Sequence, residues 1–108
     1  MTMTILEFGD THEAGGDPIY PAHRRRTAQA LSSFILIGDS APTRAVLIYN
    51  DDSTTGIHVR IGTTNTGAEA ATQADPYVGP DGTGLFHIQR KRRDDDANRI
   101  YVHAVADT

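Results

Sequence analysis

Short runs in which apolar and polar residues alternate, separated by clusters of Gly, Asn, Asp and Pro, dominate the second half of this chain. These runs predict strands at residues 45–49, 57–61, 85–89 and 100–106, and a further short strand is expected at 4–8. Alternation with a period of two is typical of strands with one buried face. The pattern predicts an all-β fold, either a small antiparallel β-sandwich or a jelly-roll-like barrel.

The segment from residue 23 to residue 37 gives a mixed signal. Its first part is rich in good helix formers, but it runs without a break into the β-rich residues 34–37. We favour one extended strand from about residue 28 to residue 37, because Ile and Phe pack well on a pleated surface. The turn residues at 41–43 then predict that 45–49 returns as its hairpin partner.

Residues 63–84 form a long stretch rich in Gly, Thr, Ala and Pro. A loop of this length in a small domain usually has a function or contains a short strand. We expect a short edge strand within residues 70–77. Asp81 and Gly82 predict a tight turn before the strand at 85–89.

The pattern divides the chain into an extended N-terminal arm with a possible short strand, residues 1–26, and a β-sandwich domain, residues 27–108. Pro18 and Pro21 favour extended backbone in the arm. Residues 11–21 of the arm have no useful periodicity. We expect the sandwich to stay folded when residues 1–26 are deleted.

The arm contains a candidate interface. Aromatic and arginine side chains are frequent among the residues that dominate binding at protein interfaces. The alternative is an ordered surface loop. The candidate interface residues are Ile19, Tyr20, Arg24, Arg25 and Arg26.

Composition indicates a single domain with a thin core. Ile, Leu, Val and Phe make up about a fifth of the 108 residues, near the lower limit for globular chains. The chain contains no cysteine, so disulfides cannot compensate for the thin core. We therefore expect stability to come partly from oligomerisation or from docking on a larger surface.

Charge and hydropathy exclude some partners. A formal net charge of −4 speaks against a nucleic-acid binder. No apolar run has the length needed to span a membrane. The first eight residues lack the basic start and long apolar stretch of a signal peptide, so we expect assembly in a cytoplasm.

Three histidines deserve consideration as metal ligands. In the strand interpretation, His58, His87 and His103 all face away from the core. If their strands were neighbours, three imidazoles could bind zinc or another divalent ion. The alternative, which we favour, is three separate polar positions, and we expect no metal and no cofactor.

The sequence also offers candidate residues for calcium binding, and it can be searched for catalytic motifs. Asp94, Asp95, Asp96 and Asn98 could offer oxygen ligands to calcium, but four basic residues at 90–93 directly precede them. A solvated hairpin tip explains this charge cluster better. The sequence lacks a cysteine nucleophile, a Gly-x-Ser-x-Gly elbow and a phosphate-binding loop, so we expect a protein that is not an enzyme.

Residues 46–50, 57–62 and 98–106 together resemble small structural proteins of tailed-phage particles. In those proteins a strand ending in Asn precedes a strand similar to Val-x-Arg-Ile-Gly, and an Ile-x-Val-x-Ala-Val-Ala strand comes last. The resemblance implies a β-sandwich or jelly-roll-like subunit of the head, neck or tail, and it carries no catalytic residues.

Within that group we expect a capsid decoration (cement) protein on the virion surface, which binds the major capsid protein and stabilises contacts between capsomers. A homotrimer is expected by analogy with decoration sites at three-fold positions. The alternatives are a neck or tail component, such as an adaptor or a small spike module, and a cupin-like metal- or sugar-binding domain.

Overall fold

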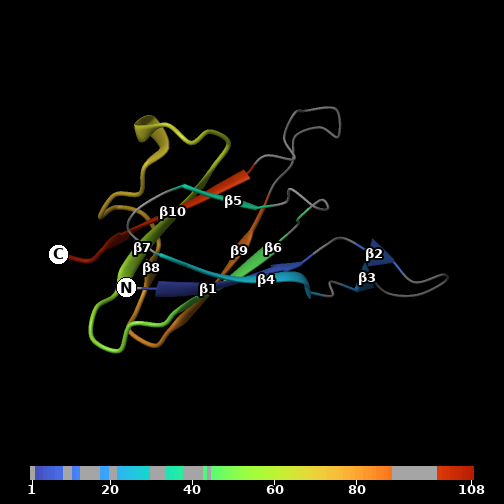
Figure 1. Cartoon of the computed structure of the whole chain (residues 1–108), viewed down its shortest axis with the longest axis horizontal. Helices are drawn as coiled ribbons and strands as arrows, with labels where there is room; N and C mark the ends of the chain where they lie inside the picture. The colour runs from blue at the N-terminus through green and yellow to red at the C-terminus, as the bar shows by residue number, and fades with distance from the viewer. Residues whose placement is uncertain are drawn as a thin grey trace.

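Two four-stranded antiparallel sheets pack face to face in the computed structural model (Figure 1), which describes residues 2–8, 11–12, 18–19, 22–29, 34–37, 43, 45–88 and 100–108. The first sheet contains, in spatial order, β4 (Ala22–Gln29), β1 (Thr2–Phe8), β6 (Ala45–Asn50) and β9 (Thr83–His87). The second sheet contains β5 (Ile35–Ile37), β10 (Ile100–Ala106), β7 (Ile57–Gly62) and β8 (Tyr77–Val78). The predicted all-β sandwich is confirmed.

A two-stranded sheet and a 3₁₀ turn lie outside these sheets in the described part of the chain. β2 (Thr11–His12) and β3 (Pro18–Ile19) pair with each other, and Figure 1 shows them apart from the two main sheets. A single 3₁₀ turn, η1 (Gly67–Glu69), lies in the connection between β7 and β8.

The core lies between the inward faces of the two sheets. Alternation along β1 and β6 buries Met3 and Ile5 beside Ile48, because Ile5 and Ile48 are directly opposed in the ladder. Burying one such aliphatic side chain contributes about 1.5–3 kcal/mol. The buried cluster also contains Ile37, Val46, Ile57, Val59, Val78, Ile100, Val102 and Ala104.

The prediction of one strand over residues 28–37, paired with 45–49, is wrong. The chain forms β4 and β5 there, and these belong to different sheets. β6 pairs instead with β1 and β9, while β5 pairs with β10. Crossing between the sheets allows Ile37 to enter the core from the opposite side to Ile48.

The long segment after β7 matches the prediction in part. A short edge strand does occur, but it is β8, at the end of the expected range. The turn at Asp81 and Gly82 is confirmed: the Gly82 N–H donates to the Gly79 carbonyl, and Asp81 adopts a φ of 54°. Asp tolerates this left-handed conformation better than most residues.

The structure divides the first 26 residues differently from the expected arm. β1 lies in the middle of the first sheet, and β4 runs across the expected boundary between residues 26 and 27. Met3 and Ile5, both fully buried, are part of the core. The sandwich is therefore not expected to fold without residues 1–26, contrary to the inference from sequence.

Candidate functional site

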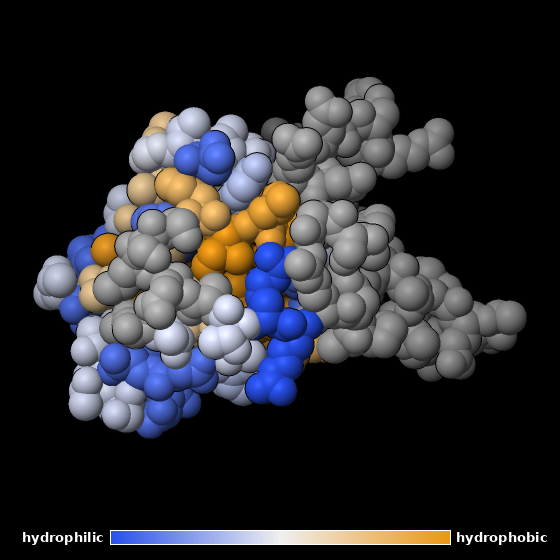
Figure 2. Space-filling model, viewed as in Figure 1, coloured by the Kyte–Doolittle hydropathy of each residue, from blue (hydrophilic) through white to orange (hydrophobic). Residues whose placement is uncertain are grey.

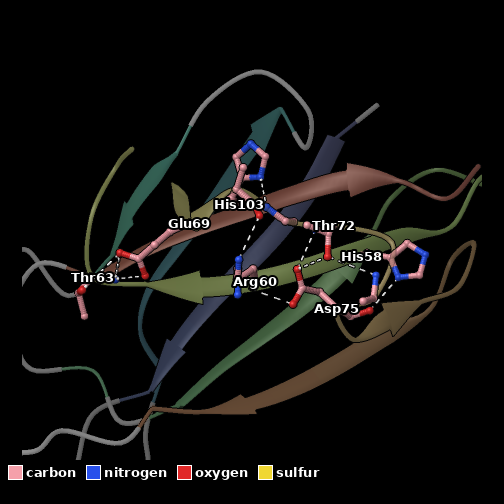
Figure 3. A network of polar contacts seen from close by, with 10 residues as sticks. His58, Arg60, Thr63, Glu69, Thr72, Asp75 and His103 are labelled. Carbon is pink, nitrogen blue, oxygen red and sulfur yellow. Dashed lines mark hydrogen bonds and ion pairs between the residues drawn. The ribbon is translucent and has the colours of Figure 1, made fainter. Parts of the chain in front are cut away.

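The outer faces of the two sheets differ, and this difference defines the candidate site. Residues 63–76, which we call the covering loop, connect β7 to the segment leading into β8 and lie against the outer face of the second sheet (Figure 3). Three outward side chains of that sheet contact it: His58, Arg60 and His103. Gln73 and Pro76 of the loop also bond to backbone groups of Ala106, Thr108 and Val59.

His58 fastens the end of the covering loop to the end of β10. Its Nδ1 lies 2.8 Å from the Asp75 carbonyl oxygen, and its Nε2 lies 2.8 Å from Asp107 Oδ1. The side chain is only 9% exposed. The hydrogen bond to the Asp107 carboxylate, followed by that to the Asp75 carbonyl, raises the pKa of His58 above its ordinary value of 6.5.

Arg60 holds the middle of the covering loop. Its Nη1 donates to the Ala70 carbonyl at 3.4 Å, and its Nε lies 3.8 Å from Asp75 Oδ1. The other carboxylate oxygen of Asp75 accepts the Thr72 N–H at 2.7 Å, which closes a tight turn. One aspartate therefore organises the end of the loop through both its backbone and its carboxylate.

His103 anchors the loop from the neighbouring strand. Its Nδ1 accepts the Ala71 N–H at 2.8 Å, and its ring stacks on Phe34 with 4.4 Å between centroids. Burial disfavours the charged form and lowers the pKa of His103 below 6.5. His58 and His103 thus lie on one sheet face with opposite preferences for a proton.

Glu69 closes the start of the covering loop. Its carboxylate accepts the Thr64 hydroxyl at 2.6 Å and the backbone N–H groups of Thr63 and Thr64. These bonds, the Thr64 hydroxyl foremost, lower the pKa of Glu69. The contacts are local and explain the shape of the loop without a ligand.

The three histidines considered as metal ligands are not brought together. His58 and His103 share the outer face of the second sheet, but His87 lies in β9 of the first sheet, where it is exposed. Within the described part of the chain, no group of three or more His, Asp or Glu residues is placed to hold a metal. The calcium candidates at 94–98 lie outside the described residues.

The outer face of the first sheet carries a band of apolar side chains among the polar ones usual on a solvated sheet. Leu6 is directly opposite Leu47 in the ladder, and Leu47 is opposite Leu85, so three leucines line up across three strands. Leu85 is 56% exposed and Tyr49 is 36% exposed. We call Leu6, Phe8, Leu47, Tyr49 and Leu85 the apolar face.

This feature was missed in the sequence, although a signal for it exists. Residues 45–49 are apolar at every position rather than at alternate ones. Such a run marks a strand whose two faces are both apolar. In β6, Val46 and Ile48 enter the core, and Leu47 and Tyr49 must then lie outside.

The interface candidates from the sequence fall in several places. Arg25 is exposed and lies opposite Leu6, at the end of the leucine row. Ile19 and Arg24 belong to β3 and β4, but their side chains, like the whole of Tyr20, lie outside what the structure describes. Arg25 is therefore the one candidate whose described side chain borders the apolar face.

Arg26 points into the sandwich. Its Nη2 lies 3.0 Å from Oε2 of the fully buried Glu7, whose Oε1 accepts the Thr43 hydroxyl at 3.2 Å. Arg26 Nη1 also donates to the Leu36 carbonyl, so it joins the edge strands of the two sheets. Figure 2 shows this side of the molecule, with hydrophobic residues over β5 next to strongly hydrophilic ones over β4. A role as an interface anchor is not supported for Arg26.

Comparison of the chain with protein-family models, with curated proteins and with solved structures finds no match. No helix in the described part of the chain has the length and hydrophobicity that crossing a bilayer requires.

Proposed function

We propose that this protein is a non-catalytic structural subunit of a phage particle, a capsid decoration protein that binds the assembled head through its apolar face. The resemblance of three strand segments to small virion proteins supports the class of protein. The apolar face is the observation that carries the proposal, because exposed apolar patches on sheets mark binding surfaces.

The contrast between the two sheets strengthens the argument. The second sheet has its outer face covered by residues 63–76 of the same chain. The first sheet presents Leu47 and Leu85 outward, and Leu85 is more than half exposed. Burying these side chains against a partner contributes about 25 cal/mol per Å² of apolar area removed from water.

The composition of this surface fits a protein partner. Leucine and aromatic side chains form its centre, and Arg25 and His87 lie at its rim. An apolar centre with a polar rim is the usual anatomy of a protein interface. In the proposal the partner is the major capsid protein, and self-association into a homotrimer adds further interface.

The number of copies per particle distinguishes a decoration protein from a neck or tail component. Quantitative mass spectrometry of purified particles, made from the genome that encodes this chain, should give hundreds of copies in a simple ratio to the capsid protein. About a dozen copies or fewer would assign the protein to the neck or tail instead. Absence from the particle would overturn the proposal.

A matched pair of variants tests the surface. Leu85→Lys places a charge on the apolar face, and Asn65→Lys places the same charge on the exposed covering loop of the other sheet. We expect Leu85→Lys to weaken binding to undecorated particles by at least about tenfold, while Asn65→Lys binds normally. Circular dichroism checks that both variants are folded, and equal binding by both would contradict the role of the apolar face.

A further inference from the structure

Two of the side chains that attach the covering loop to the second sheet are histidines, and their hydrogen bonds require different protonation states. His58 lies at the loop end near Asp75 (Figure 3). His103 accepts a hydrogen bond from the Ala71 N–H. The two side chains project from neighbouring strands, because β7 and β10 are paired.

The His58 anchor requires the imidazolium form. Both ring nitrogens face oxygen acceptors, the Asp75 carbonyl at 2.8 Å and the Asp107 carboxylate at 2.8 Å. A neutral imidazole has one N–H and one lone pair, so it can donate to only one of them. Loss of the proton therefore sets a nitrogen lone pair against an oxygen and breaks one end of the contact.

The His103 anchor requires the neutral form. Its Nδ1 accepts the Ala71 N–H at 2.8 Å, which is possible only when that nitrogen carries no proton. Protonation places two N–H groups against each other. The stacked Phe34 ring on its other side offers no acceptor in the plane of the imidazole.

The charged and titratable groups around the pair favour this division. His58 is surrounded by Asp75 of the loop, Asp107 after β10 and Tyr77 of β8, whose ring centroid is 5.3 Å away. His103 lies directly opposite Arg60 of β7 in the ladder, and the next outward position of β10 is Tyr101. Carboxylates thus stand beside His58, and Arg60 lies near both histidines, opposite His103 and two residues from His58 along β7.

We propose that the covering loop is a pH-gated cover, fastened at both anchors only near neutrality, released at Ala71 in acid and loosened in alkali, when neutral His58 keeps only one of its contacts to Asp75 and Asp107. This inference is independent of the proposed function. Loosening at either anchor would expose more of the outer face of the second sheet beside Arg60, whose side chain is already 43% exposed. The exposure of this surface would then depend on pH.

Linkage between histidine protonation and loop closure gives the direction in which pH acts through each histidine. We call the loss of closure at lower pH the acid limb and the loss at higher pH the alkaline limb. The pKa of His58 is raised in the closed state, so its contribution is complete below 6.5 and is lost as pH rises through the raised pKa. The pKa of His103 is lowered, so its contribution is complete above 6.5 and is lost as pH falls through the lowered pKa. Loop closure is therefore greatest near pH 6.5 and falls on both sides.

Amide hydrogen exchange measures this directly. The Ala71 N–H reports the acid limb, and the Asp75 N–H, which donates to the Thr72 carbonyl at 3.0 Å, reports the alkaline limb. After correction for intrinsic exchange, we expect protection to peak near pH 6.5 and to fall by up to about tenfold per pH unit on each side. The range should stay above about pH 5, so that Glu69 and Asp52, whose pKa values are lowered, remain ionised.

Variants separate the two limbs. His103→Asn keeps an oxygen acceptor but does not titrate, so the acid limb should vanish while the alkaline limb remains. His58→Gln should remove the alkaline limb alone. His87→Asn, on the other sheet, is the control and should leave the profile unchanged. A limb that persists in the variant lacking its histidine would overturn the proposal.

NMR of the histidine ring nitrogens in the unaltered protein tests the same proposal and does not depend on whether a variant folds. At about pH 6.5 the His58 ring should carry protons on both nitrogens, and the His103 ring should carry one, on Nε2. The same protonation state for both rings, or a flat exchange profile, would also overturn the proposal.

Discussion

Asn50 shows at the scale of a single residue how one buried polar side chain joins several segments. Its Nδ2 donates to the carbonyls of Thr55 at 2.8 Å and Gly79 at 3.1 Å, and its Oδ1 accepts the Asp52 N–H at 3.0 Å. The residue is 1% exposed. The amide therefore ties the turn after β6 to the turn before β9 inside the sandwich.

We predict that Asn50→Ala destabilises the protein by about 2–4 kcal/mol, because buried carbonyl and N–H groups lose their partners. Asn50→Asp has the same shape but sets an oxygen against the same carbonyls, so it should be worse, increasingly as pH rises. Urea unfolding at several pH values measures both. Asn65→Ala, in the exposed covering loop, should stay within about 0.5 kcal/mol of the parent.

At the scale of the element, β6 shows two uses of apolar side chains on one strand. Ile48 points inward and is fully buried, while Leu47, its neighbour, points outward. Leu47 meets Leu85 of β9 on that outer side. The inner side chains stabilise the chain itself, and the outer ones are available to a partner.

This division predicts opposite effects for two similar truncations. Ile48→Ala leaves a cavity in the core and should cost about 2–5 kcal/mol of unfolding free energy. Leu85→Ala, at a position already 56% exposed, should cost less than about 1 kcal/mol while weakening particle binding. Chemical denaturation gives the first quantity and co-sedimentation with particles gives the second. A large stability loss for Leu85→Ala would mean that the apolar face supports the monomer instead.

At the scale of the whole molecule, the N-terminal strand completes the sandwich. β1 is hydrogen-bonded to β4 on one side and to β6 on the other, so it joins the two halves of the first sheet. A small domain with few large apolar residues has little reserve against the loss of a central strand.

We predict that deletion of residues 1–8 abolishes cooperative unfolding, because it removes two fully buried core side chains and leaves β4 and β6 without their shared neighbour. Thermal denaturation followed by circular dichroism, together with the dispersion of amide NMR signals, measures this. A sharp unfolding transition in the truncated chain would show that β1 is dispensable.

The local sequence pattern predicted the positions of the strands better than it predicted which strands pair. Five strands were expected near their observed positions, and the turn at Asp81 and Gly82 was correct, because alternation and turn chemistry are properties of neighbouring residues. The pairing of residues 45–49 with 28–37 was wrong, because pairing depends on which sheet a strand joins. The histidines were correctly placed on outward faces, but neither the covering loop that buries His58 nor the separation of His87 was foreseen.

The sequence by itself determined that this protein is an all-β chain with a thin core, because strand periodicity, turn residues and composition are read without knowledge of the fold. The tertiary structure decided everything that depends on contacts between distant residues. It aligned Leu6, Leu47 and Leu85 on one surface and placed Asp107 beside His58. A side chain's exposure and its affinity for a proton depend on neighbours far along the chain, and only folding brings those neighbours together.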